Sequence, residues 1–442
     1  MANFAKPDGP RFSVDVYQNE YLPEGGSQVD AIVTVTASGG GTLGGAAPAP
    51  GRPSAAVAVM VDCSGSMDYP PAKMRGAREA TAAAIDTLRD GTRFAVIGGT
   101  HVAQEVYPGG GRLAVADATT REQAKQALRR LSAGGGTAIG TWLRLADRLL
   151  SAADVTIRHG ILLTDGRNEH ESPEELRATL DACAGRFTCD ARGVGTDWDV
   201  KEVTGVASAL LGTADIVADP AGLAADFTRM METAMGKEVA DVALRVWTPL
   251  GATLRFVKQV APAVEDLTHR RTGAGPRAGD YPTGSWGDES RDYHLSVTVP
   301  PAGLGQEMLA ARVSLVVPQP DGTVQNLGAQ GLVRAVWTDD MAASTAMSPQ
   351  VAHYTGQAEL AQAIQQGIDL RKAGDFDGAT AKLGRAVQLA DASGNADTAK
   401  LLAKVVDVVD AATGTVRLKT RVTEADEMTL ETRSTKTVRV KK

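Results

Sequence analysis

The sequence predicts an α/β fold in which a doubly wound, mostly parallel sheet is inserted into a β-sandwich and followed by a helical region. Between residues 54 and 236, apolar strand-like runs alternate with helical patterns, which indicates a parallel sheet covered by helices on both faces. On either side of this block, strand-like segments follow one another without helices, as they do in an antiparallel sandwich. Beyond Met347 the apolar residues recur at helical spacing.

The first strand-like segments, residues 11–17 and 28–36, alternate apolar and polar side chains with a period of two. Two strands rarely fold alone. We therefore expect residues 10–38 to pair with strands of the block at residues 238–340 and to complete one sandwich with them. A linker rich in Gly, Pro and Ala, residues 39–53, leads into the central block.

The central block, residues 54–236, is predicted to start with a strand at 55–61 and a helix at 72–88. Further strands are expected at 93–97, 159–164, 188–194 and 215–217, and further helices at 121–131, 141–152, 173–182 and 222–235. Parallel strands place their carboxyl ends at one edge of the sheet. Ligands of open α/β sheets bind in the crevice at that edge.

The sandwich is expected to continue with strands at 239–247, 253–257, 293–299, 308–317 and 331–337. Residues 350–412 are predicted to be helical, with a third helix through Leu401 and Val409, and residues 363–390 resemble a single tetratricopeptide-like hairpin. Because such repeats need about three units to stack stably, we interpret these helices as an appendage packed on the sandwich. The tail, residues 413–442, is polar and rich in Thr, which favours a flexible segment.

The composition excludes several classes of protein. The net charge is −7 over 442 residues, and no basic face of the density that nucleic acids require occurs. No run of about eighteen apolar residues is present, so no membrane-spanning helix is expected. Three cysteines do not make a disulfide framework, and Cys183 and Cys189 are expected to be reduced and buried. The first ten residues lack the pattern of a signal peptide, so we expect a cytoplasmic protein.

Three segments of the central block place oxygen-bearing side chains at the predicted carboxyl edge. They are Asp62, Ser64 and Ser66 after the first strand, Thr137 after three glycines at the start of a helix, and Asp165 at the end of the strand at 159–164. Oxygen ligands without a set of His or Cys suit a hard cation such as Mg2+ or Mn2+. Two carboxylates would balance a divalent charge, and the neutral hydroxyls would leave the ion electrophilic, with a coordination position free for an outside carboxylate. The residues therefore predict a metal site at this edge.

These motifs resemble those of the von Willebrand factor A (VWA) domain over about residues 54–236: Asp62-x-Ser64-x-Ser66, Thr137 in a Gly-Gly-Thr context and Asp165 in a Thr-Asp-Gly context. They match all five positions of that family's metal-ion-dependent adhesion site (MIDAS). The resemblance implies a Rossmann-like domain that binds Mg2+, with Mn2+ or Ca2+ as alternatives. It implies that Ser64, Ser66 and Thr137 coordinate the ion directly, and that Asp62 and Asp165 do so directly or through water. The wider layout is similar to bacterial proteins of the Ca-activated-chloride-channel and inter-alpha-inhibitor heavy-chain type.

The function predicted from the sequence is a non-enzymatic, Mg2+-dependent module that binds an Asp or Glu side chain of a partner protein. Cys63, inside the first motif, is expected to be a buried filler and not a nucleophile. Three alternatives stay open. The serines could merely cap the following helix, and the same oxygens could serve a metal-dependent hydrolase, although no general base accompanies them.

The third alternative is a signalling scaffold. A Ser/Thr kinase would modify the flexible tail, and a phosphothreonine-binding domain would recognise the product. The candidate acceptors are Thr420, Thr423, Thr429, Thr432, Thr435 and Thr437.

Overall fold

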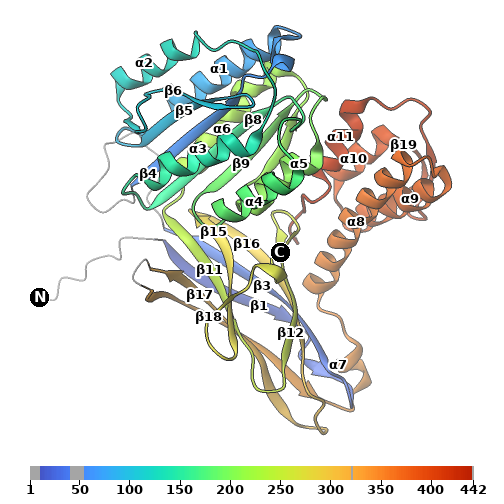
Figure 1. Cartoon of the computed structure of the whole chain (residues 1–442). Helices are drawn as coiled ribbons and strands as arrows, with labels where there is room; N and C mark the ends of the chain where they lie inside the picture. The colour runs from blue at the N-terminus through green and yellow to red at the C-terminus, as the bar shows by residue number, and fades with distance from the viewer. Residues whose placement is uncertain (1–9, 40–53, 320–321, 441–442) are drawn as a thin grey trace, which may run out of the picture. The chain divides into compact units, whose positions relative to one another are not determined.

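The computed structural model describes residues 10–39, 54–319 and 322–440. The chain forms two compact units, which Figure 1 shows together. The first unit holds the central α/β block, Gly39–Ala240, with Gly284–Gly287; the second holds Arg11–Ser38, Asp241–Thr283 and Asp288–Lys442. The N-terminal strands pair with strands that follow the central block. The prediction that an α/β domain is inserted into a β-sandwich is therefore confirmed.

The α/β unit is built on a seven-stranded sheet with the order β10-β9-β8-β4-β5-β6, and β7 pairs with β5. Strands β4, β5, β8, β9 and β10 are parallel, whereas β6 and β7 are antiparallel to β5. This confirms the predicted mostly parallel sheet. The strands are β4 (Ala55–Asp62), β5 (Arg93–Gly99), β6 (Ala103–Tyr107), β7 (Ala114–Val115), β8 (Ile157–Thr164), β9 (Thr188–Val194) and β10 (Ala214–Val217). The helices are α1 (Ala72–Thr87), α2 (Ala118–Leu128), α3 (Ile139–Ser151), α4 (Pro173–Cys183), α5 (Val200–Ala209) and α6 (Leu223–Met235), with 3-10 turns η1 (Gly65–Asp68) and η2 (Pro220–Gly222).

The sequence does not predict β6, β7 or α5. The α5 segment is rich in Val and Thr, whose branched side chains lower helix propensity. The helix is stabilised by its surroundings. Asp199 accepts hydrogen bonds from the backbone N–H groups of Lys201 and Glu202, and Val203 and Val206 are buried. Tertiary packing therefore decides this element.

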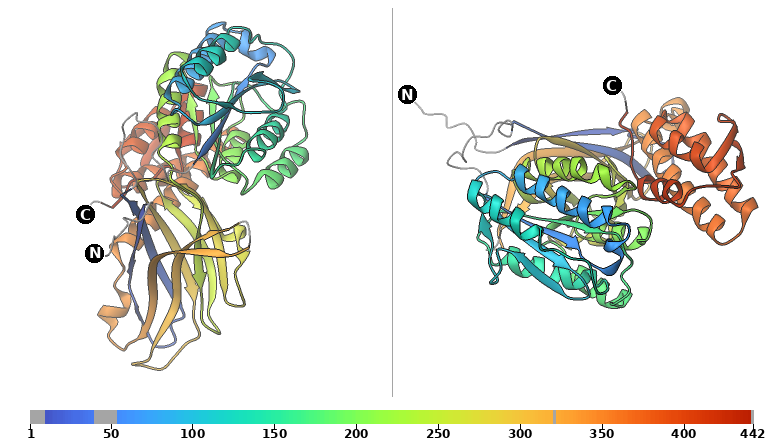
Figure 2. Two further views of the ribbon diagram at one scale, coloured as in Figure 1. Left: turned by 90° about the vertical axis from the view of Figure 1, so that its left-hand side faces the viewer. Right: turned by 90° about the horizontal axis from the view of Figure 1, so that it is seen from above.

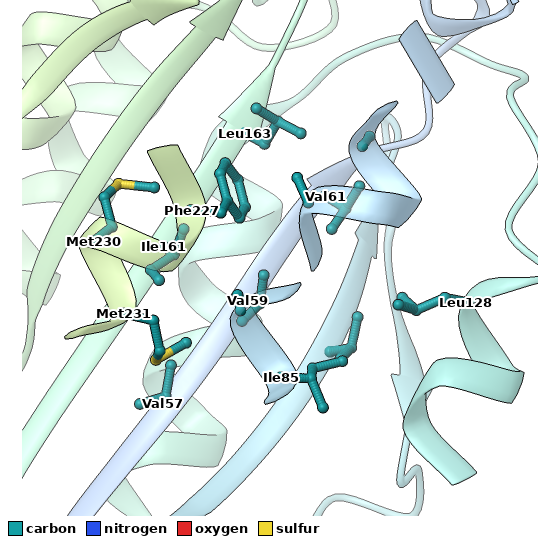
Figure 3. Close-up of a cluster of buried hydrophobic side chains, with 14 of the residues drawn as sticks. Val57, Val59, Val61, Ile85, Leu128, Ile161, Leu163, Phe227, Met230 and Met231 are labelled. Carbon is teal, nitrogen blue, oxygen red and sulfur yellow. The ribbon is translucent and has the colours of Figure 1, made fainter. Parts of the chain in front are cut away.

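Helices α1 and α6 cover one face of the sheet, with α2 beside α1, and α3, α4 and α5 cover the other (Figure 1). Alternate residues of β4, namely Val57, Val59 and Val61, belong to the core under α1 and α6, as the period of two in a strand requires. Figure 3 shows Phe227 and Met231 of α6 beside these valines. This packing fixes the direction of β4 and the place where its last residue emerges.

Strand β4 lies between β8 and β5, so the chain first continues to β5 on one side and later returns to β8 on the other. Such a reversal is the topological switch point at which open α/β sheets bind ligands. Asp62 is the last residue of β4, and Asp165 directly follows β8. The sheet therefore brings the two predicted carboxylates to neighbouring strand ends.

The sandwich of the second unit consists of two sheets, with the orders β1-β3-β16-β12-β13 and β14-β15-β11-β17-β18-β2. Strands β3 and β16 pair antiparallel and join the segments before and after the inserted block. The sequence does not predict β15, which contains Gly and Pro residues that are rare in strands. The strands are β1 (Arg11–Gln18), β2 (Tyr21–Leu22), β3 (Gln28–Ser38), β11 (Val239–Trp247), β12 (Thr253–Ala261), β13 (Glu265–Asp266), β14 (Thr272–Gly273), β15 (Ala278–Trp286), β16 (Glu289–Thr298), β17 (Glu307–Pro318) and β18 (Val324–Trp337), with a 3-10 turn η3 (Thr268–Arg270).

A helical region follows the sandwich in the same unit, and α8, α9, α10 and α11 gather into one group in Figures 1 and 2, whereas α7 lies beside the sandwich strands. Helix α8 joins this group to the sandwich, because Val351 and Tyr354 pack on Ile32 and Val260. The helices are therefore an appendage packed on the sandwich. The elements are α7 (Met341–Thr345), α8 (Pro349–Lys372), α9 (Phe376–Ala392), α10 (Ala396–Val405), β19 (Val406–Asp410), β20 (Thr415–Leu418) and α11 (Glu424–Arg433).

The tail from Thr413 is folded in the described residues, and the prediction of a flexible segment is wrong. It forms β20 and α11, and Val416 and Leu430 are buried against α8, α9 and α10. Beyond α11 the chain runs along the β12–β13 connection, where the Val264 N–H donates to the Thr435 carbonyl (2.8 Å). The few apolar residues of the tail have no period of their own, since each fills a gap in a core that other helices build.

The third predicted helix is also shorter than expected. Helix α10 ends at Val405, and Val409 lies in β19, which pairs with β20. Val405 and Val406 are both buried, whereas Val409 is exposed. The valines at helical spacing therefore do not form one helix. The chain changes from helix to strand where it leaves the helical core.

The state of the cysteines and the character of the helices match the expectations from the sequence. Cys63, Cys183 and Cys189 are free and buried, which confirms the expectation for the latter two. No helix in the described ranges has the length and apolar character needed to cross a bilayer.

Leu430→Ala should lower the free energy of unfolding by about 2–4 kcal/mol, because it removes a fully buried side chain and leaves a cavity. Urea unfolding followed by circular dichroism measures the loss. Val409→Ala, at a position that is 58% exposed, is the matched control and should change stability by less than about 0.5 kcal/mol. Equally small effects of both substitutions would contradict a folded tail.

Candidate metal centre

Asp62 ends β4 and is completely buried at the carboxyl edge of the sheet. Its Oδ1 accepts a hydrogen bond from the Ser64 backbone N–H (2.7 Å). Its Oδ2 accepts hydrogen bonds from the Thr164 hydroxyl (2.6 Å) and the Asp165 N–H (3.4 Å). These donors come from the turn after β4 and from the end of β8. The carboxylate therefore holds together the two segments that meet at the switch point.

Three hydroxyl groups gather beside this carboxylate. Ser64 and Ser66 lie in the turn after β4, with their Oγ atoms 2.9 Å apart, and Thr137 lies in the loop before α3. All three surround one side of Gly166. A Cβ at that glycine would lie 3.1 Å from Ser66 Oγ, 3.3 Å from Thr137 Oγ1 and 3.7 Å from Ser64 Oγ. The structure therefore brings the Thr137 hydroxyl to the two serine hydroxyls.

Asp165 lies in the same cluster and is also completely buried. Its Oδ1 accepts a hydrogen bond from the Ser66 hydroxyl (2.7 Å), and its Oδ2 accepts one from the Lys73 ammonium group (2.7 Å). Lys73 lies in the first turn of α1 and also donates to Asp197 (2.9 Å). Both oxygens of Asp165 are therefore occupied, one by a hydroxyl of the cluster and the other by a cation.

The loop that carries Thr137 is fixed by its backbone. The Gly65 N–H donates to the Gly135 carbonyl (2.9 Å), which ties this loop to the turn after β4. Gly135 has a φ of +79°, a conformation that a side chain would strain. A Cβ on Gly136 would lie 1.9 Å from the His170 ring. The glycine run is thus required for the close approach of the loop that presents Thr137.

The loop after β8 caps the N-terminus of α3. Asn168 Oδ1 accepts a hydrogen bond from the Ile139 N–H (2.8 Å), and Glu171 Oε2 accepts one from the Gly140 N–H (2.8 Å). A carboxylate is favoured at this end of a helix because it satisfies free N–H groups and opposes the helix dipole. These contacts hold the Thr137 loop against the Asp165 loop.

Burial dominates the electrostatics of Asp62. It raises the pKa of this carboxyl to about 6. Hydrogen bonds from Ser64 and Thr164 oppose the rise, and the neighbouring charge of Asp165 adds to it. Two carboxylates that are charged and buried side by side cost free energy. A divalent ion at this position would relieve that cost.

Burial acts in opposite directions on the two titratable groups beside Asp62. Burial alone would lower the pKa of Lys73, but the hydrogen bonds to Asp165 and Asp197 outweigh it and raise that pKa, so the ammonium stays charged. Burial raises the pKa of the Cys63 thiol to about 12, and the charge of Asp62 contributes. Because only the thiolate is a nucleophile, Cys63 has the properties of a buried filler.

The chemistry of the cluster fits a hard divalent cation, because its donors are carboxylate and hydroxyl oxygens. Within the described ranges, no group of three or more His, Cys, Asp and Glu side chains is arranged to hold a metal. The cluster depends on hydroxyls instead. The alternative in which the serines cap a helix does not hold, since the N-cap of α1 is Pro71 and the Ser64 side chain makes no capping hydrogen bond to η1.

Sequence reasoning misses Thr164, Lys73 and Asn168 as parts of the cluster. Lys73 carries a usable signal, because it shares a face of α1 with Ala77 and Ala80, and a cation on an apolar face needs a buried partner. It also misses two histidines near the Thr137 loop, whose imidazole rings have centroids 6.0 Å apart: His101 and His170. These residues are distant in sequence from the motifs, so their proximity emerges only from the fold.

An open, doubly wound sheet with an oxygen-lined cluster at its switch point defines an α/β domain suited to holding a hard cation. The chain belongs to the von Willebrand factor type A family. The family model of the von Willebrand factor type A domain matches residues 55–216, and the model of the von Willebrand factor type A C-terminal domain matches residues 388–434. Domains of this family generally mediate protein–protein interactions and bind divalent metal ions.

Two solved structures extend the comparison to the whole chain. The chain is similar to a von Willebrand factor type A protein from Catenulispora acidiphila, with 50% identity over 100% of this chain and 99% of that chain and a TM-score of 0.92. It shares its fold with the ArnB paralog VWA2 from Sulfolobus acidocaldarius, with 13% identity over 96% of this chain and 98% of that chain and a TM-score of 0.59. No curated protein matches the chain.

The raised pKa of Asp62 predicts a pH-dependent stability of the metal-free protein. Below about pH 3 this carboxyl is mostly protonated in both the folded and the unfolded chain. As the pH rises toward 6, the unfolded chain releases the proton while the folded chain retains it, so stability falls. In EDTA, wild type should lose up to about 3 kcal/mol over this range relative to Asp62→Asn, which cannot ionise. Urea unfolding at several pH values measures the difference, and parallel pH profiles would contradict the raised pKa.

Proposed function

We propose that this protein is a divalent-metal-dependent module that binds partner proteins. The side chains that would hold the ion are Asp62, Ser64, Ser66, Thr137 and Asp165. The ion would be Mg2+, with Mn2+ or Ca2+ as alternatives, and an Asp or Glu of the partner would complete its coordination. The observation that carries this proposal is the convergence of three hydroxyls on one side of Gly166, beside two buried carboxylates.

The ligand set favours the capture of an external anion. The three hydroxyls are neutral, and the Lys73 ammonium offsets one of the two carboxylate charges, so part of the charge of a divalent ion would stay uncompensated. Ser66 is the most exposed of the five side chains, since the other four are at most 4% exposed. A partner therefore reaches the site from the side of Ser66. Tyr69, three residues further along, is 83% exposed, and large exposed aromatic side chains are typical of protein interfaces.

Membership of the family supports binding over catalysis, because von Willebrand factor type A domains are generally interaction modules without enzymatic activity. The scaffold alternative loses support from the folded tail: Thr432 is buried, the Thr437 hydroxyl donates to the Val260 carbonyl (2.6 Å) and Thr423 caps α11. The cytoplasmic location expected from the sequence stays a prediction.

The hydrolase alternative requires a general base close to the ion. The structure brings His101 and His170 to the Thr137 loop, but among the described residues no carboxylate orients either ring by a hydrogen bond. A base in a hydrolytic site is normally held in place by such a partner. We therefore expect wild type with Mn2+ to show no turnover of p-nitrophenyl phosphate esters above buffer. Turnover that disappears in both Asp165→Ala and His170→Ala would establish the hydrolase instead.

Asp62→Ala should weaken the binding of Mn2+ at least tenfold, because it removes a buried charge that the ion needs. Isothermal titration calorimetry measures the affinity. Asp154→Ala is the matched control, since Asp154 is an exposed acid in the loop before β8, at the other end of that strand, and its affinity should equal that of wild type. Equal affinities of all three proteins would contradict the assigned site.

Binding of the partner protein should depend on the bound metal ion. In pull-downs from a lysate of the native host, wild type and Asp154→Ala should retain the same protein in Mg2+ and lose it in EDTA. Asp62→Ala should fail to retain that protein in either buffer while keeping a wild-type circular dichroism spectrum. A protein that is retained equally in EDTA would show that the site does not mediate binding.

A further inference from the structure

Lys73 is the cation that lies inside the candidate metal centre. It occupies the first turn of α1 and is 5% exposed. Its ammonium nitrogen lies 2.7 Å from Asp165 Oδ2 and 2.9 Å from Asp197 Oδ2. The lysine stem lies beside Gly195, where a Cβ would be in ordinary van der Waals contact with Cε at 3.5 Å. The fold therefore buries the stem and directs the charge of this side chain at the cluster.

The ammonium is connected to the hydroxyl cluster through one carboxylate. Asp165 accepts a hydrogen bond from Ser66 with Oδ1 and one from Lys73 with Oδ2, each 2.7 Å long. Any ion held by the Ser66 hydroxyl would therefore share Asp165 with Lys73. Both cations would draw on the same negative charge.

The charges of the buried cluster explain what this sharing does. Asp62 and Asp165 supply two negative charges, and Lys73 returns one positive charge. Asp197 counts less, because its side chain is 67% exposed and screened by water. The cluster would therefore carry one net negative charge before a divalent ion binds and one net positive charge after it has bound.

We propose that Lys73 is an internal cation that weakens the binding of the free metal ion and strengthens the capture of a carboxylate by the loaded site. This inference rests on the proposed function. The two effects have one cause, since the charge that opposes the ion attracts the anion that follows it. Because the carboxylate would bind to the ion itself, ion and partner would bind cooperatively, each raising the affinity for the other.

A purely structural role for Lys73 predicts a different outcome. If the lysine only held Asp165 in position, its removal would disorder the carboxylate and lower the affinity for the ion. If it acts through its charge, its removal raises that affinity. The two roles therefore differ in the sign of the effect.

The test compares the affinity for Mn2+ of wild type and Lys73→Met, in which a neutral side chain replaces most of the lysine stem. Affinity should rise roughly tenfold, the size that Coulomb's law gives for one charge a few ångströms from a divalent ion under strong screening. Lys73→Arg keeps the charge and is the matched control, with an affinity near that of wild type. The rise in Tm on adding Mn2+ should also be larger for Lys73→Met than for wild type.

A second variant tests the same charge from the opposite side. Asp197→Asn leaves the ammonium in place but removes one of its two carboxylate partners, so the affinity for Mn2+ should fall. This variant keeps the proposal testable if Lys73→Met does not fold.

Acetate serves as the carboxylate probe. Replacing chloride by acetate should raise the apparent affinity for Mn2+ more in wild type than in Lys73→Met, after the same correction for acetate bound to free Mn2+.

The outcomes separate this inference from the proposed function. If wild type binds Mn2+ through Asp62 but Lys73→Met binds it equally or more weakly, the internal-cation role is overturned and the proposed function stands. A higher affinity of Asp197→Asn overturns it as well. If Asp62→Ala binds Mn2+ as wild type does, the assignment of the site itself fails, whatever the behaviour of the lysine variants.

Discussion

Two carboxylates buried at the end of one sheet are the constraint on which the rest of the α/β unit depends. Asp62 and Asp165 are withdrawn from water, and a buried charge persists only where hydrogen bonds and opposite charges surround it. The chain supplies these from several directions: Ser64 and Thr164 donate to Asp62, and Ser66 and Lys73 donate to Asp165. The same contacts that satisfy the charges therefore fix the turn after β4, the end of β8 and the start of α1 relative to one another.

The hydroxyl cluster follows from that arrangement. Thr137 reaches the serines because Gly135 and Gly136 allow its loop to approach, and because Asn168 holds the first turn of α3. All of these contacts are made by residues of the chain itself, so the protein contributes directly to positioning the oxygens. A site prepared in this way loses less conformational entropy when it captures a ligand, and it leaves the net charge of the cluster as the main control of affinity.

A buried carboxylate also organises the second unit. Asp292 in β16 is 4% exposed and accepts hydrogen bonds from Thr34, Tyr354 and Arg439. Residues from the N-terminal strands, from α8 and from the last described segment of the chain therefore meet at one side chain. This contact explains why the helical appendage and the C-terminal segment belong to the same unit as the sandwich, although the sandwich strands are separated in sequence by the whole α/β block.

The sequence by itself determined the alternation of strands and helices, the insertion of one domain into another and the motifs at the strand ends. These depend on local periodicity and on short spacings that a single sequence displays. Only the tertiary structure decided that Lys73 turns inward to Asp165, that His101 and His170 lie by the Thr137 loop, and that Leu430 belongs to the helical core. Each of these depends on a partner that is far away in the chain, and such a partner leaves no local pattern. The polar tail is the clearest case, because its few apolar residues are ordered by burial against α8, α9 and α10 and not by any propensity of their own.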